Sequence, residues 1–226
     1  MLARSLVLTF HGLNEPIVPM EEGAERYFVS QSCFERMISS LDELESRSGC
    51  LISVTFDDGN LSDYDIGVPR LLDAGRTGQF FVLAGRIGQK GFLSGAQMRE
   101  MIACGMTIGS HGYDHVDWRK LDGAGRQREY FDARRRIEDV IGIEVNRVAI
   151  PFGAFDRRVL HGLKAAGYER VYTSTAGLCL ESSWFQPRWS VRRGFSPDRD
   201  LPRRLGPVSI AKGTAYALLR RVRYRI

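Results

Sequence analysis

The chain has 226 residues, of which 43% are hydrophobic and 26% charged, a composition typical of a globular domain with one sizeable core. This excludes global disorder, and no apolar run approaches the roughly 20 residues that a membrane-spanning helix needs. The apolar stretch within residues 1–10 is too short for the core of a secretory signal peptide. Together with four widely spaced cysteines and no CxxC pair, it leads us to expect a cytoplasmic protein.

Short apolar runs alternate with longer amphipathic segments along the chain. The runs that predict strands are Ser5–Phe10, Leu51–Phe56, Gly78–Leu83, Met106–Ser110, Arg147–Ile150 and Arg170–Ser174. The segments that predict helices are Ser32–Glu45, Gly67–Ala74, Ser94–Cys104, Gly123–Val140 and Asp156–Ala166. This order predicts an α/β fold around a parallel sheet, either open and doubly wound or closed into a barrel.

Three segments depart from the alternation. Gly12–Gln31 contains two prolines and several acids, which predicts a long loop at the rim of a site. After Ser174 the pattern weakens, and Trp189–Val191 is the best candidate for a seventh strand. Residues 199–226 contain eight Lys/Arg and one Asp, a local charge of +7 within a net charge of +5. We therefore separate a main domain, residues 1–198, from a basic tail, residues 199–226.

The last stretch of the basic tail, residues 216–226, has two interpretations from the sequence. It is either a solvated chain end or a short amphipathic helix that contacts an anionic membrane surface, which would place the protein at the inner membrane face. No nucleic-acid partner is expected, because no known nucleic-acid-binding module accompanies the basic residues.

Polar residues follow four of the predicted strands. His11 follows the first strand, Asp57 and Asp58 the second, His111 the fourth and the turn 151–153 the fifth. Because the carboxyl ends of parallel strands converge on one face of an α/β fold, we expect these residues to meet.

The types of residue gathered there favour a metal. Asp57 and Asp58 would repel each other at a buried strand end unless they shared a cation or a proton, although a turn with an N-cap Asp is the simpler interpretation of this pair alone. His111 and His115 are four residues apart, close enough to bind one ion. Two histidines and a carboxylate form a three-ligand site with open positions, as catalytic metals require.

Three motifs carry a family resemblance: TFDDG at residues 55–59, SHGYDH at 110–115 and IPFGAFD at 150–156. In sequence, order and spacing they resemble the first three motifs of the polysaccharide deacetylase (NodB-homology) superfamily, over at least residues 5–175. The resemblance implies a distorted (β/α)7 barrel, with residues 1–198 as the catalytic domain. It also implies a divalent metal, most commonly zinc, with cobalt, nickel or manganese as alternatives, and removal of acetyl groups from N-acetylated sugars.

The resemblance also assigns roles. It makes Asp58, His111 and His115 the metal ligands and Asp57 the general base for the attacking water. A backbone N–H in the turn Pro151–Phe152 would stabilise the oxyanion. This division agrees with the chemistry, because a metal lowers the pKa of water and a neighbouring carboxylate completes its deprotonation.

The chain departs from the family pattern at the acid that protonates the leaving amine. No Leu-x-His motif occurs late in the sequence, which leaves His11 and His161. His161 lies inside a predicted helix and is interpreted as a surface residue. His11 ends the first strand, as in the permuted arrangement of poly-N-acetylglucosamine deacetylases, so we predict that it is the acid; a structural or substrate-positioning role is the alternative.

A second departure is Ala149, which occupies the place of the family's motif-three arginine. Arg188 could replace that arginine and orient Asp57, with Arg147 as the weaker candidate and a surface salt bridge as the competing interpretation. Trp184 or Trp189 could supply a hydrophobic wall beside the acetyl group, although packing is the commoner role of tryptophan.

The sequence therefore predicts a metal-dependent hydrolase that removes N-acetyl groups from a sugar or an exopolysaccharide intermediate. The alternatives are hydrolysis of another non-peptide C–N bond, as in a cyclic ureide, and a non-catalytic sugar-binding relative.

Overall fold

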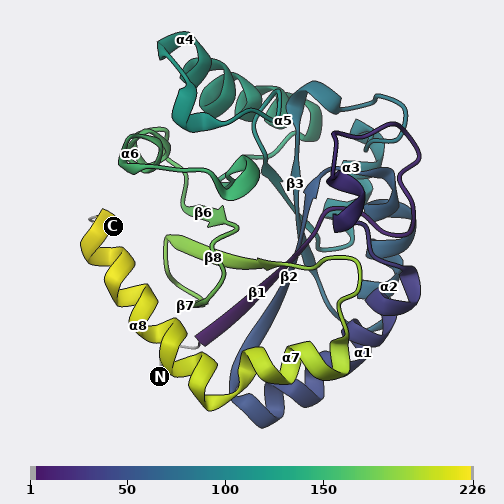
Figure 1. Ribbon diagram of the computed structural model, residues 1–226. Helices are drawn as coiled ribbons and strands as arrows, with labels where there is room; N and C mark the ends of the chain where they lie inside the picture. Colours follow the sequence, from purple (N-terminus) through teal and green to yellow (C-terminus); the bar gives the residue numbers. More distant parts are fainter. Residues whose placement is uncertain (1–3, 225–226) are drawn as a thin grey trace.

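A computed structural model describes residues 4–224, in which a ring of strands is surrounded by helices (Figure 1). The strands are β1 (Arg4–Phe10), β2 (Cys50–Asp58), β3 (Gly78–Val82), β4 (Thr107–Ser110), β5 (Arg147–Ala149), β6 (Arg170–Thr173), β7 (Leu178–Leu180) and β8 (Phe185–Ser190). The α-helices are α1 (Gln31–Ser48), α2 (Val68–Asp73), α3 (Gly95–Ala103), α4 (Gly123–Arg126), α5 (Ala133–Ile141), α6 (Arg157–Ala165), α7 (Pro197–Leu205) and α8 (Pro207–Tyr224).

Seven parallel strands of the described chain close into a barrel. Their order is β2-β3-β4-β5-β6-β8-β1, and β1 pairs with β2 to complete the ring. One edge of β1 is shared: β8 pairs in parallel with Val7–Thr9, whereas β7 runs antiparallel to Arg4–Leu6. This closed but irregular ring confirms the predicted distorted (β/α)7 barrel and excludes the open sheet.

Both faces of the barrel strands are buried, which explains their almost continuous apolar runs. Side chains alternate along β1, so that Leu8 and Phe10 join the core beneath the helices. Val7, which precedes Leu8 and points to the opposite face of the strand, packs inside the barrel with Phe81 and Tyr172. The barrel interior is therefore a packed core that supports whatever lies at its carboxyl end.

Two predicted helices differ from the structure, one in where it begins and the other in its continuity. The segment predicted from Gly67 begins earlier, because a π-helical turn at Asp63–Gly67 leads directly into α2. The segment predicted over 123–140 forms α4 and α5 with a π-helical turn, Gln127–Asp132, between them. The wider turn lets the adjacent residues Glu129 and Tyr130 both lie inside the protein.

The seventh barrel strand is longer than predicted. Trp189–Val191 overlaps only the end of β8, which begins at Phe185, and β7 was not predicted. The sequence pattern does not indicate most of β8, because Gln186, Pro187 and Arg188 interrupt its apolar run. All three residues are nevertheless buried.

The basic tail predicted from residue 199 begins inside α7. Leu201 and Leu205 of this helix are buried in the main core, and α7 packs beside α1 (Figure 1). In α8, Gly213 lies against β7, and the Tyr224 ring is 5.1 Å from that of Phe155. Residues 197–205 are thus part of the barrel body, while the functional division of the chain at residue 198 stays a prediction.

Among residues 4–224, no helix combines the length and the apolar character that crossing a bilayer requires.

Candidate functional site

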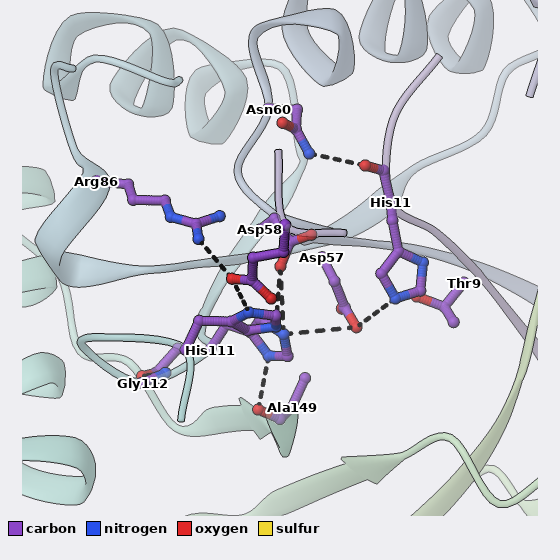
Figure 2. Close-up of polar contacts among 12 residues, drawn as sticks. Thr9, His11, Asp57, Asp58, Asn60, Arg86, His111, Gly112 and Ala149 are labelled. Atoms are coloured by element: carbon purple, nitrogen blue, oxygen red, sulfur yellow. Dashed lines mark hydrogen bonds and ion pairs between the residues drawn. The ribbon is translucent and has the colours of Figure 1, made fainter. Parts of the chain in front are cut away.

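The predicted site residues meet at the carboxyl ends of the barrel strands (Figure 2). Asp57 and Asp58 end β2, while His11 and His111 directly follow β1 and β4. Asp58 has a φ of 74° and Gly59 a φ of 71°, both in the left-handed region. This turn interrupts the alternation of side chains along the strand, so the two adjacent carboxylates both face His111.

Asp58, His111 and His115 form one compact cluster. Asp58 Oδ1 lies 3.5 Å from His111 Nε2 and 3.6 Å from His115 Nε2, and the three candidate ligand atoms are all within 4.8 Å of one another. His111 Nδ1 lies 2.9 Å from the Ala149 carbonyl, which can only accept, so Nδ1 carries the hydrogen and Nε2 presents a lone pair to Asp58.

The cluster fits a divalent cation. Asp58 Oδ1 is buried and has no hydrogen-bond donor among the described residues, although a buried carboxylate oxygen normally has one. Burial lowers the pKa of His111 to about 4, so its imidazole is neutral at pH 7 and available as a ligand. Two nitrogens and one carboxylate oxygen are a donor set that zinc and similar ions accept.

Asp57 is held by a buried ion pair with Arg188 of β8. The arginine Nη1 donates to Oδ1 at 2.6 Å and Nη2 donates to Oδ2 at 2.7 Å, while Nη1 also contacts the hydroxyls of Thr9 and Thr55 at 3.2 Å. Burial alone would raise the pKa of Asp57, but the Arg188 guanidinium outweighs it and holds that pKa below its usual range. The structure thus brings Arg188 to Asp57, whereas Arg147 donates to a glutamine elsewhere in the barrel.

His11 lies on the opposite side of Asp57 from His111 (Figure 2). Its Nε2 is 3.8 Å from Asp57 Oδ2, and His111 Nε2 is 4.0 Å from the same oxygen. The ring of Tyr27 lies 4.8 Å from the His11 imidazole, and Asn60 donates to the His11 carbonyl at 2.7 Å. Burial lowers the pKa of His11 although Asp57 opposes the shift, so the imidazole is mainly neutral at pH 7.

The turn after β5 forms one wall of the site. Pro151 is buried, whereas Phe152 is 58% exposed and has a φ of 58°, in the left-handed region. The Phe152 ring lies 4.4 Å from that of His115, so the turn borders the histidine cluster. Gly153 follows with a φ of 62°, and a Cβ there would lie 2.8 Å from the Ser174 backbone nitrogen, so this position requires glycine.

Two glutamates that support the site were not predicted from the sequence. Glu129 is buried and accepts hydrogen bonds from the backbone nitrogens of Tyr113 and Asp114 and from Trp118 Nε1, which fixes the loop between the two histidines. Glu21 reaches His115 from the loop after β1. The only sequence signal for Glu21 is the richness of that loop in acids, and nothing in the helical pattern marks Glu129.

Of the two interpretations of Trp184 and Trp189, the structure supports packing and not a hydrophobic wall beside the acetyl group. Trp184 precedes β8, at the opposite end of the barrel, and its Nε1 donates to the Tyr168 carbonyl. Trp189 packs beneath the Arg204 guanidinium of α7, 4.6 Å away. Both tryptophans pack outside the site. His161 is exposed on α6, as predicted.

Comparison with known proteins yields matches in sequence. The family model described as polysaccharide deacetylase matches residues 45–171. The Bacillus subtilis (strain 168) protein named "Putative polysaccharide deacetylase YxkH" is 28% identical over 126 residues, which are 56% of this chain and 45% of that protein. The matched region thus spans about half the length of each.

Solved structures match over most of the chain. The Streptococcus pyogenes deacetylase PplD, in complex with acetate, superposes with a TM-score of 0.77 at 19% identity, over 92% of this chain and all of that one (100%). A de-N-acetylase from Aggregatibacter actinomycetemcomitans superposes with a TM-score of 0.67 at 14% identity, over 92% of this chain and 99% of that one. At these identities the likeness establishes the shared fold.

Proposed function

Because the chain belongs to the polysaccharide deacetylase family, we propose that it is a metal-dependent hydrolase that removes N-acetyl groups from an N-acetylated sugar or an exopolysaccharide intermediate. One observation carries the proposal. Asp58 Oδ1 faces two histidine Nε2 atoms at 3.5 and 3.6 Å, directly beside a carboxylate, Asp57, that a buried arginine keeps ionised. The similar structures, a deacetylase in complex with acetate and a de-N-acetylase, support an acetyl group on nitrogen as the group removed.

Asp58, His111 and His115 would hold the cation, for which zinc is our first choice. When bound, such an ion lowers the pKa of water and polarises the amide carbonyl. Asp57 accepts the proton of the attacking water through Oδ2, the oxygen that faces both His11 and His111. Arg188 holds the carboxylate in place and keeps it free of a proton until the reaction requires one.

His11 completes the proton transfer. Asp57 Oδ2 passes the proton that it took from water to His11 Nε2, 3.8 Å away, and as the C–N bond breaks the protonated imidazole gives this proton to the leaving amine. The products are acetate and a free amino sugar, and both groups return to their starting states. The backbone N–H of Phe152 in the strained turn would donate to the carbonyl oxygen as negative charge develops there, as other oxyanion sites do.

Acetate release from N-acetylglucosamine oligomers by zinc-loaded protein tests this proposal. We expect release by the wild type and a loss of at least about 100-fold in Asp57→Asn, because the amide cannot accept the water proton. Equal release by Asp57→Asn would overturn the assignment of the base. Ring opening of a cyclic ureide without acetate release would indicate the other hydrolase, and glycan binding without any turnover would indicate a sugar-binding relative.

We further propose that α8 contacts an anionic membrane surface, which would keep a cytoplasmic enzyme at the inner membrane face. Val208, Tyr216 and Leu219 are 67%, 57% and 62% exposed and recur on one side of the helix. Residues 207–224 contain four Lys/Arg and no acid, so their charge matches anionic lipid and opposes pairing with a second copy.

Co-sedimentation of the full chain with phosphatidylglycerol vesicles tests this contact, with phosphatidylcholine vesicles as the control. We expect binding to the anionic vesicles only, and weaker binding for Leu219→Glu. Equal behaviour with both lipids, or concentration-dependent dimers without lipid binding, would overturn it.

A further inference from the structure

We propose that Glu21, on the loop between β1 and α1, is a positioning residue that orients His115 and fixes its tautomer for the cation. The inference rests on the proposed function, because it concerns the ion held by Asp58, His111 and His115. Neither the family motifs nor the spacing of the histidines points to Glu21, which lies 94 residues from His115 in the sequence.

The backbone and the neighbouring rings place His115 but do not set its tautomer. His115 adopts a φ of 56°, in the left-handed region, within the loop after β4. Its ring is bordered by the imidazole of His111 at 5.3 Å and by the exposed ring of Phe152 at 4.4 Å. These contacts restrict the plane of the ring, but they do not determine which ring nitrogen carries the hydrogen.

Glu21 supplies that choice. Its Oε1 lies 2.9 Å from His115 Nδ1, and a carboxylate can only accept, so Nδ1 carries the hydrogen. Nε2 is then left with its lone pair facing Asp58 Oδ1 at 3.6 Å. His111 has the same arrangement with a different partner, since its Nδ1 lies 2.9 Å from the Ala149 carbonyl. Both candidate metal histidines are thus prepared through Nδ1, one by a backbone carbonyl and one by a carboxylate.

Glu21 is itself held in place. Arg86 Nη2 donates to the same Oε1 at 3.1 Å, and the Arg86 guanidinium stacks on the ring of Phe92, 5.1 Å from its centre. Val18, in the same loop, packs against Gly91, where a Cβ would lie only 2.9 Å from the valine side chain. The segment after β3 therefore clamps the part of the loop that carries Glu21.

The same loop also reaches the other side of the site. Tyr27, six residues after Glu21, places its ring 4.8 Å from that of His11. The loop after β1 therefore contacts His115 through Glu21 and His11 through Tyr27. The site is thus built from this loop as well as from the barrel strands. We therefore expect a change in this loop to affect both the cation site and the proposed acid.

The test is the zinc affinity of chelator-stripped protein, measured by competition with a chromophoric chelator. Partners of metal-ligating histidines typically contribute about 10–100-fold in affinity, so we expect Glu21→Ala to raise the Kd for zinc by that factor. Glu21→Gln keeps an acceptor oxygen and should recover most of the affinity. Glu22→Ala removes the same charge at the next, exposed position and should change the Kd less than about two-fold.

Three outcomes decide between the claims. Equal Kd values for Glu21→Ala, Glu22→Ala and the wild type would overturn the role of Glu21 while leaving the proposed function intact. Equal losses in Glu21→Ala, Glu21→Gln and Glu22→Ala would show a general effect of charge and would also overturn it. Absence of zinc binding by the wild type would contradict the metal site itself, and with it both proposals.

Discussion

Replacement of Arg188 by methionine should destabilise the protein severely. Arg188 is 0% exposed, and its two terminal nitrogens contact the two carboxylate oxygens of Asp57 at 2.6 and 2.7 Å. Methionine keeps an unbranched apolar side chain near the rings of Phe81 and Tyr172, over which the guanidinium lies, but leaves the Asp57 charge buried without its arginine partner. Breaking a buried ion pair in this way costs about 3–5 kcal/mol, out of the roughly 5–15 kcal/mol that stabilise a typical domain.

The assay is urea unfolding of chelator-treated protein at pH 7, followed by circular dichroism. Arg193→Met is the matched control, because Arg193 contacts Glu15 at 2.8 and 2.9 Å with both side chains more than half exposed. A surface pair of this kind contributes about 0–1 kcal/mol. The double variant Asp57→Leu with Arg188→Met should recover most of the loss, since replacing both partners of a buried pair is often neutral. A loss in Arg188→Met no larger than that in Arg193→Met would refute the reasoning.

Three further predictions concern single residues. His11→Gln should lower turnover by about 100-fold or more while zinc affinity stays within about two-fold, and full turnover would contradict its role as the acid. Asp156→Ala removes the N-cap that accepts from Val159 N and should cost about 1 kcal/mol at pH 7. Burial alone would raise the pKa of Asp156, but hydrogen bonds, the first of them from the Val159 N–H, lower it below its usual value. The stabilisation by Asp156 is therefore complete above the unfolded pKa of about 4 and is lost as the pH falls through the folded pKa. A difference in unfolding free energy between wild type and Asp156→Ala that is unchanged at acid pH would contradict this. Glu129→Ala removes the acceptor from buried donors that include Trp118 Nε1, so we expect a loss of about 3 kcal/mol in urea unfolding and weaker zinc binding; a loss below about 1 kcal/mol would argue against its role.

The sequence predicts those parts of the fold that depend on local pattern. The first six barrel strands lie within a few residues of their predicted places, because strands buried on both faces give apolar runs closed by turn residues. β8 was mostly missed, because Gln186 and Arg188 face a polar part of the barrel interior and interrupt its pattern. β7 is three residues long and pairs with β1, more than 170 residues away, which no local pattern records.

The same distinction applies to the site. Asp57, Asp58 and His111 lie at strand ends, and all four residues including His115 lie within the family motifs, so their meeting could be predicted. The contact between Arg188 and Asp57 was less certain from the sequence, because Ala149 replaces the family's arginine and the pattern does not indicate which distant arginine takes its role. The roles of Glu21 and Glu129 could not be predicted. The contact of Glu21 depends on the path of a loop, and that of Glu129 depends on a π-helical turn that points its side chain into the protein interior.

Acetate release during zinc titration tests the central claim most directly. Chelator-stripped protein is mixed with N-acetylglucosamine oligomers, and the initial rate is measured as zinc is added from zero to two equivalents, with His111→Ala measured in parallel. The account predicts a rate near zero without zinc that rises to a plateau at about one equivalent per chain, and no such rise for His111→Ala. Release that is independent of zinc, or no release from protein that has bound one equivalent, would contradict it.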